Sequence, residues 1–255
     1  MSRLDIFRAA LAAILLAMMA LPMGAWATPS LQVVIPSADT VPQLGIHLDV
    51  DNTTTIFTKK SEGGHANPVN MGLTVGILES RKFGLEGGLD IREQSDFPLS
   101  YNFKILIREG ALHYLSPAVA FGMYQIGSAK AQADFDIAYG LVSKTFPALG
   151  RLSAGLYIGS QTRLVNRDGE AENAGLMASF DRTLAEIDGR LWLVVDYMSG
   201  DNALGALSLG LAYRFVMPPG PGVSATLGYN IYNDKRIAGE NTITLQFDID
   251  LNQDW

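Results

Sequence analysis

The sequence predicts an all-β protein: an up-and-down antiparallel transmembrane β-barrel of about twelve strands that follows a cleaved signal peptide. Three observations indicate this fold. Apolar and polar residues alternate in segment after segment, most segments are about 10–13 residues long, and turn-forming residues separate them. The chain of 255 residues is 48% hydrophobic, only 18% charged and rich in glycine, with 26 residues of that type. This composition argues against intrinsic disorder.

Residues 1–27 are expected to be a secretory signal peptide. Arg3 and Arg8 give a basic start, an uncharged apolar run follows from Ala9 to Leu21, and Ala25 and Ala27 place small residues before the expected cleavage point. The apolar run is too short to cross about 30 Å of hydrocarbon as a helix. Residues 28–42 then form an N-terminal periplasmic segment, which either follows the rim of the barrel or enters its lumen.

Residues 43–255 form the predicted barrel. Residues 241–251 show the pattern best, because Ile243, Leu245, Phe247 and Ile249 alternate with polar residues. Side chains along a strand point alternately to its two faces, so such a segment has one apolar and one polar face. The expected strands are 44–57, 69–79, 82–92, 98–108, 116–126, 133–144, 151–163, 173–182, 188–198, 204–215, 222–232 and 241–251.

The two faces of these segments favour a membrane barrel over a soluble sandwich. Large aromatic residues gather on the apolar face, many of them near strand ends, as in the aromatic girdles of membrane barrels. Glycines and most charges share the other face, which suits a crowded, hydrated lumen. In segment 133–144 the same rule turns Phe135, Ile137, Tyr139 and Leu141 toward lipid. An up-and-down barrel must also pair its last strand with its first, because an open edge cannot lie in lipid.

The chain resembles the small bacterial outer-membrane β-barrel proteins of about twelve strands, an uncharacterised porin-like family. The whole pattern carries this resemblance, together with IPSADTVPQLGIHLDVDN, DYMSGDNALGALSLGLAYRF and GYNIYND. The apolar residues of the last strand and the final Trp255 resemble the C-terminal signal that the barrel assembly machinery reads, although Gln253 interrupts it. The resemblance implies a location in the bacterial outer membrane, with lipid, lipopolysaccharide and that machinery as partners, and it implies no site residues.

Enzymatic chemistry has little support in the sequence. Membrane hydrolases of this size pair a histidine and a serine two residues apart on one strand face. None of the three histidines, His47, His65 and His113, has that partner. With no cysteine in the chain, thiolate metal sites and cysteine nucleophiles are excluded. We therefore expect no catalytic residue, no metal and no cofactor, with a small residual chance of a membrane hydrolase.

Charged residues with lumen parity are the candidate functional residues. They fill the barrel as a salt-bridge network or line a narrow hydrated channel. The candidates are His47, Asp49, Asp51, Glu86, Asp90, Lys104, Arg108, Asp134, Asp136, Arg163, Arg190, Asp196, Arg214, Asp248 and Asp250.

The expected function is a narrow channel or porin for small solutes or ions. The alternatives are a non-conducting barrel with a structural or surface-interaction role and, third, an outer-membrane enzyme. The net charge of −7 weighs against nucleic acid as a partner. The acids of residues 44–57 and 241–251 meet at the expected closure, which predicts a modest preference for cations.

Overall fold

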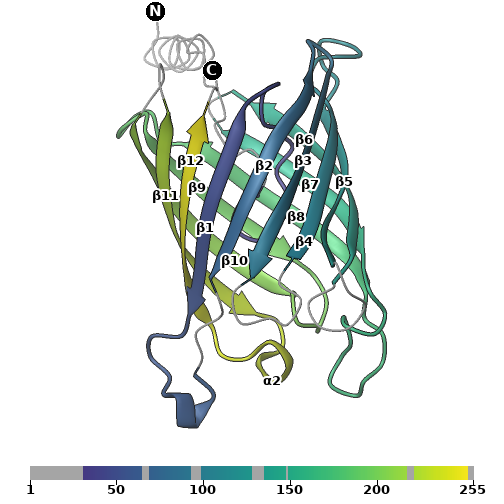
Figure 1. The fold of residues 1–255 in the computed structure, drawn as a ribbon, viewed down its shortest axis with the longest axis vertical. Helices are drawn as coiled ribbons and strands as arrows, with labels where there is room; N and C mark the ends of the chain where they lie inside the picture. Colours follow the sequence, from purple (N-terminus) through teal and green to yellow (C-terminus); the bar gives the residue numbers. More distant parts are fainter. Residues whose placement is uncertain are drawn as a thin grey trace, which may run out of the picture.

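The computed structural model describes residues 31–64, 69–92, 99–127, 135–147, 149–216 and 221–251. In these ranges, twelve antiparallel strands close into a barrel in which each strand pairs with its neighbours in the sequence and β12 pairs with β1 (Figure 1). No helix in the same ranges is long and apolar enough to cross a membrane. The predicted fold class is confirmed. The predicted signal peptide and Trp255 lie outside the described residues.

The strands follow the sequence segments closely, with ends that differ by a few residues. They are β1 (Ile46–Thr54), β2 (Asn70–Glu79), β3 (Phe83–Arg92), β4 (Leu99–Ile107), β5 (Ala118–Gly127), β6 (Ile137–Phe146), β7 (Gly150–Ile158), β8 (Ala174–Thr183), β9 (Leu191–Met198), β10 (Ala206–Val216), β11 (Gly222–Tyr232) and β12 (Thr242–Leu251). Two short helical turns, η1 (Lys60–Glu62) and α2 (Lys235–Ala238), lie in the connections β1–β2 and β11–β12.

The barrel has two distinct ends. We call the end at which β1 begins and β12 ends the termini end, and the opposite end the loop end. The connections that contain η1 and α2 both lie at the loop end (Figure 1). Turns at the termini end are shorter in places: only three residues, 80–82, separate β2 from β3.

The outer surface of the barrel is apolar and the lumen carries most of the polar side chains. Phe103, Leu209 and Phe247 are 40–47% exposed on the outer face. Ser208 and Thr226, which point to the lumen face, are fully buried. A soluble barrel would show the reverse distribution, with its apolar face inside. The exposed apolar face is therefore a lipid-facing surface.

Strand β6 departs from the predicted facing. Ile137, Tyr139 and Leu141 are at most 7% exposed and face the lumen, whereas Val142 is 47% exposed on the outside. Phe135 packs against the same buried cluster. The assignment of these residues to the lipid face was wrong, because alternation identifies two faces without showing which of them points inward. Part of this lumen is apolar.

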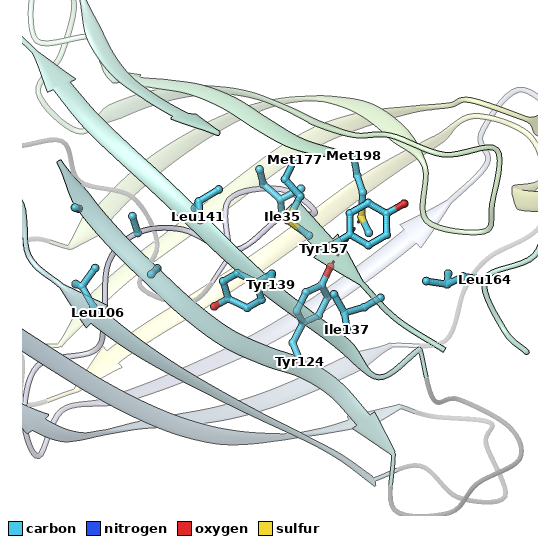
Figure 2. Packing of buried hydrophobic residues seen from close by; sticks show 13 residues of the cluster. Ile35, Leu106, Tyr124, Ile137, Tyr139, Leu141, Tyr157, Leu164, Met177 and Met198 are labelled. Carbon is cyan, nitrogen blue, oxygen red and sulfur yellow. Dashed lines mark hydrogen bonds between the residues drawn. The ribbon is translucent and has the colours of Figure 1, made fainter. Parts of the chain in front are cut away.

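The apolar part of the lumen is filled by the start of the described chain. Residues 31–42, here called the lumen segment, run inside the ring of strands (Figure 1). Ile35 and Ala38 of this segment belong to one buried cluster with side chains from β4 to β9, and Figure 2 shows Ile35 among Leu141, Met177 and Met198. Of the two positions considered for this part of the chain, rim and lumen, the structure shows the lumen.

Glycines on the lumen face make room for this segment. A methyl group added at Gly210 would lie 2.7 Å from Val33 Cγ2, and one added at Gly84 would lie 2.1 Å from Thr40 Oγ1. A methyl group at Gly76 would meet the carbonyl oxygen of Pro42 at 1.8 Å. Since no side chain fits at these positions, the glycines shape the wall to the segment's backbone and side chains.

Candidate functional site

The lumen segment is held by a carboxylate on β9. One oxygen of Asp196, Oδ2, accepts hydrogen bonds from three consecutive backbone amides, those of Val33 at 2.8 Å, Val34 at 2.9 Å and Ile35 at 3.4 Å. Asp196 is 1% exposed. Successive N–H groups that converge on one anion form a nest, so Asp196 both orders the turn at 33–35 and has its own charge stabilised by it.

A second anchor is an ion network around Arg151 at the start of β7. Its Nη1 lies 2.6 Å from Asp39 Oδ2 of the lumen segment, and its Nε lies 2.9 Å from Asp181 Oδ1 on β8. Asp181 also accepts from Gln32 Nε2 at 3.1 Å and from the indole of Trp192 at 3.2 Å. The guanidinium is therefore neutralised by two carboxylates, of which Asp181 is fully buried and Asp39 partly exposed.

Lys104 and Glu86 form the third anchor. The Lys104 ammonium lies 2.9 Å from Glu86 Oε1 and donates at 2.9 Å to the carbonyl oxygen of Asp39. The other Glu86 oxygen accepts from the amide of Val41 at 2.7 Å. Arg151 and Lys104, two cationic side chains of the described lumen, thus have carboxylate partners and touch the lumen segment.

The opposite wall carries a different set of charges, where β12 closes on β1. The predicted pairing of the last strand with the first is confirmed, and its register places His47 opposite Asp250 and Asp49 opposite Asp248. His47 Nδ1 lies 2.8 Å from Asp250 Oδ1, and its Nε2 lies 3.7 Å from Asp248 and 4.0 Å from Asp49. We call His47, Asp49, Asp248 and Asp250 the seam cluster.

Neighbouring strands complete the surroundings of the seam cluster. Ser224 donates to Asp248 at 3.2 Å, and the guanidinium of Arg214 interacts electrostatically with Asp248 and Asp250. The carboxylate of Asp49 packs on the backbone of Gly72, where an added methyl group would lie 2.1 Å from Asp49 Oδ1. In the described part of the chain, no three His, Asp or Glu side chains are arranged to hold a metal ion.

Among the cavities formed by the described residues, three follow the lumen past the lumen segment. The largest, about 430 Å³, lies toward the loop end, and we call it the vestibule; Asp51, Asn70 and Gln246 line it with residues from α2 and from the lumen segment. A cavity of about 70 Å³ between the segment and the wall of β1 to β6 contains Asp49, Asp90 and Thr74. One of about 30 Å³ near the termini end is lined by Arg214 and Ser224 among others.

The structure brings most of the sequence-predicted candidates into the lumen. Asp51, Asp90 and Arg214 line its cavities, and Asp90 accepts a hydrogen bond from Asn102 at 3.0 Å. The full set with lumen positions is His47, Asp49, Asp51, Glu86, Asp90, Lys104, Asp196, Arg214, Asp248 and Asp250.

Three candidates, Arg108, Asp136 and Arg163, are corrected by their positions outside the lumen, and Arg190 lies at its rim. Arg163 is exposed in the β7–β8 connection, whereas Arg190, exposed just before β9, lines the small cavity near the termini end together with Arg214. Arg108 follows β4 and binds Glu79 at 2.6 Å at the termini end, and Asp136 is exposed just before β6. In each case the predicted strand extended past the end of the observed one. A residue beyond the end of a strand no longer follows the alternation of its two faces. Asp134 lies outside the described residues.

The sequence reasoning did not single out Arg151, Trp192 or Asp39 as lumen residues. Arg151 shares its parity with Ser153, which is also buried, so the polar face of β7 was a usable signal. Nothing in the alternation indicated that Asp39 would reach it from a segment without strand periodicity.

Comparisons with known proteins identify the type of barrel. No family model and no curated protein sequence matches the chain. Among solved structures, the NanC porin is similar with a TM-score of 0.50 at 9% identity, over 81% of this chain and 100% of that one. The KdgM porin (TM-score 0.48, 7% identity, 81% and 99% covered) and outer membrane phospholipase A from Escherichia coli (0.45, 10%, 85% and 100%) also match. The chain has the barrel fold of outer-membrane porins.

Proposed function

We propose that this protein is a narrow outer-membrane channel for small solutes, with a preference for cations, whose path runs along the β12–β1 closure beside the lumen segment. The observation that carries the proposal is the division of charge in the lumen. Arg151 and Lys104 anchor the segment on one side. Carboxylates gather on the other side, where β12 closes on β1 and where Gln246 Nε2 donates a hydrogen bond to the carbonyl oxygen of Val33.

The two walls differ in their charge balance. On the segment side, Arg151 and Lys104 are matched by Asp39, Asp181 and Glu86. On the closure side, the described lumen residues include four carboxylates, Asp49, Asp51, Asp248 and Asp250, against His47 and Arg214, and Asp90 of β3 shares a cavity with Asp49 and Lys104. Rings and strips of carboxylates in a pore attract cations and repel anions.

The cavities lie in an order that fits this path. The vestibule reaches Asp51 and Gln246, the middle cavity reaches Asp49 and Asp90, and the small cavity near the termini end reaches Ser224, which binds Asp248. A 12-strand barrel lies between filled eight-stranded barrels and open porins. A lumen that the segment fills in part, with cavities beside it, is consistent with that size.

The exposed apolar face and the porin-type fold support a location in the bacterial outer membrane. With the termini end toward the periplasm, the vestibule opens to the outside, and solutes enter between the connections at the loop end. Lipopolysaccharide and the barrel assembly machinery are partners that this location implies, and we include them in the proposal.

Conductance across a planar lipid bilayer tests the function. The full protein, refolded and inserted, should give small discrete current steps, and a potassium chloride gradient should give a reversal potential of the sign for cation selectivity. Current steps with anion selectivity would contradict the proposed path. Absence of steps from protein that is folded by heat-modified gel mobility would instead indicate a barrel closed by its lumen segment.

A further inference from the structure

The vestibule has two unlike walls. Tyr124 of β5, Phe135 before β6 and Leu204 before β10 give one wall apolar and aromatic surface. Asp51 of β1 and Asn230 of β11 belong to the other, which β11, β12, β1 and β2 form. A solute held between these walls therefore meets apolar contact on one side and hydrogen-bonding groups on the other.

The polar wall is concentrated at one level of the barrel. Asp51 is the pairing partner of both Asn70 on β2 and Gln246 on β12, so these three side chains lie side by side across neighbouring strands. Among the described residues that line the vestibule, Asp51 is the sole charged one. Its single carboxylate disfavours an anionic solute and favours a group with one positive charge.

Three amide oxygens around this cavity have no hydrogen-bond partner among the residues that the structure describes. Asn70 Oδ1, Gln125 Oε1 and Asn230 Oδ1 are buried and accept no hydrogen bond from any described residue. All three residues line the vestibule. Buried acceptors are normally satisfied, so the vestibule offers acceptor oxygens for N–H donors.

We propose that the vestibule is a binding site for an amphipathic organic cation, whose ammonium group faces Asp51 and the amide oxygens of Asn70 and Asn230 while its apolar part packs against Tyr124, Phe135 and Leu204. The volume of about 430 Å³ falls in the range of small-molecule sites. Aromatic rings beside a cation add a further attraction. The floor, formed by Leu31, Val33 and Val34 of the lumen segment, contributes apolar surface. This inference rests on the proposed function, because it takes the bound cation to be a solute that passes through the channel.

A matched series of small probes tests the site on the refolded full chain. Benzylammonium, benzyl alcohol and benzoate share an aromatic ring and carry a positive, neutral and negative head group respectively, and methylammonium keeps the ammonium without the ring. By calorimetric titration, benzylammonium should bind tightest, by roughly tenfold over benzyl alcohol and over methylammonium, and benzoate should bind weakest. Equal affinities for benzylammonium and benzoate would overturn the proposal.

Variants separate the roles of the two walls. Asp51→Asn should weaken benzylammonium by roughly tenfold and leave benzyl alcohol unchanged, because only the charge is removed. Asn230→Asp should raise the affinity for benzylammonium several-fold. This variant tests the site even if Asp51→Asn does not fold. Asp168→Asn, an exposed carboxylate in the β7–β8 connection, is the matched control and should change neither affinity. No response to Asp51→Asn and Asn230→Asp in folded protein would reject the site.

The experiments can reject the binding site and the channel separately. If the protein binds benzylammonium in an Asp51-dependent way but does not conduct, the proposed binding site is supported and the proposed channel is rejected. If the protein is a cation-selective channel that neither binds benzylammonium nor is blocked by it from the loop end, the proposed channel is supported and the proposed binding site is rejected.

Discussion

At the scale of single residues, the side chain allowed at position 210 is limited by a part of the chain that is distant in sequence. An added methyl group at Gly210 would lie 2.7 Å from Val33 Cγ2 and 2.8 Å from Val194 Cγ1. We therefore expect Gly210→Ala to destabilise the protein by about 1–3 kcal/mol through overpacking. Urea unfolding of the refolded protein in lipid vesicles, followed by tryptophan fluorescence, measures the change.

A companion variant shows whether the lumen segment causes that cost. Val33→Ala removes one of the two clashing groups, so the double variant should be more stable than the sum of the single effects predicts. Gly189→Ala, where an added methyl group meets nothing within 4 Å, is the matched control and should be nearly neutral. A Gly210→Ala protein as stable as Gly189→Ala would mean that the segment does not occupy this place.

Asp188, a residue outside the strands, contributes to the stability of the protein in a way that depends on pH. In the turn between β8 and β9, Asp188 accepts hydrogen bonds from Arg190 Nε at 3.2 Å and Nη2 at 2.9 Å. These bonds lower the pKa of Asp188 to about 2, below the ordinary value of about 3.9. The ionised carboxylate therefore adds stability that is complete above the ordinary pKa and disappears as pH falls through about 2.

The Asp188→Asn variant should therefore lose less stability than the native protein when pH is lowered from 5 to 2. The urea midpoint at pH 5, 3 and 2 measures this slope for both proteins. Asp168→Asn removes the same charge from an exposed loop and serves as the control. Parallel slopes for native protein and Asp188→Asn would show that the Arg190 contact has no part in acid stability.

At the scale of elements, the strands were predictable, whereas for residues 28–42 the sequence left both the rim and the lumen as possible positions. Apolar and polar residues alternate within each strand, so the location of a strand such as β12 (Thr242–Leu251) follows from its local sequence. Residues 31–42 have no period because their partners are Asp196, Arg151 and Glu86, which lie 45 or more residues further along the chain. The same long-range packing explains β6: its apolar face turns inward to cover Ile35, which alternation alone cannot show.

The lumen segment itself should stay in place while ions pass. Its departure would expose Ile137, Leu141 and Met177, which are at most 1% exposed, to a hydrated lumen. A cysteine pair tests this, since the native chain has no cysteine. An added Cβ at Gly228 would lie 3.1 Å from Val33 Cγ1, close to the separation of a Cβ and the partner sulfur in a disulfide.

Val33→Cys with Gly228→Cys should oxidise to a single disulfide, with Thr244 rotating toward the vestibule to make room. Single-channel conductance should be the same before and after reduction, because the path runs beside the segment. The Val33→Cys single variant controls for the change at position 33. Current that appears only after reduction would mean that the segment must leave for the channel to open.

At the scale of the whole molecule, ion preference depends on which charges line the β12–β1 closure rather than on the net charge of the chain. Asp49→Asn with Asp248→Asn removes two carboxylates from the seam cluster and leaves the anchors of the lumen segment intact. Asp136→Asn with Glu170→Gln changes the net charge equally, but on exposed loop residues. Charges on the walls of a narrow lumen act more strongly on a passing ion than exposed, screened charges do. The reversal potential across a salt gradient should therefore move toward zero for the seam variant and stay near the native value for the loop variant. An equal shift for both pairs would show that selectivity comes from the overall field of the protein and would reject the path along the closure.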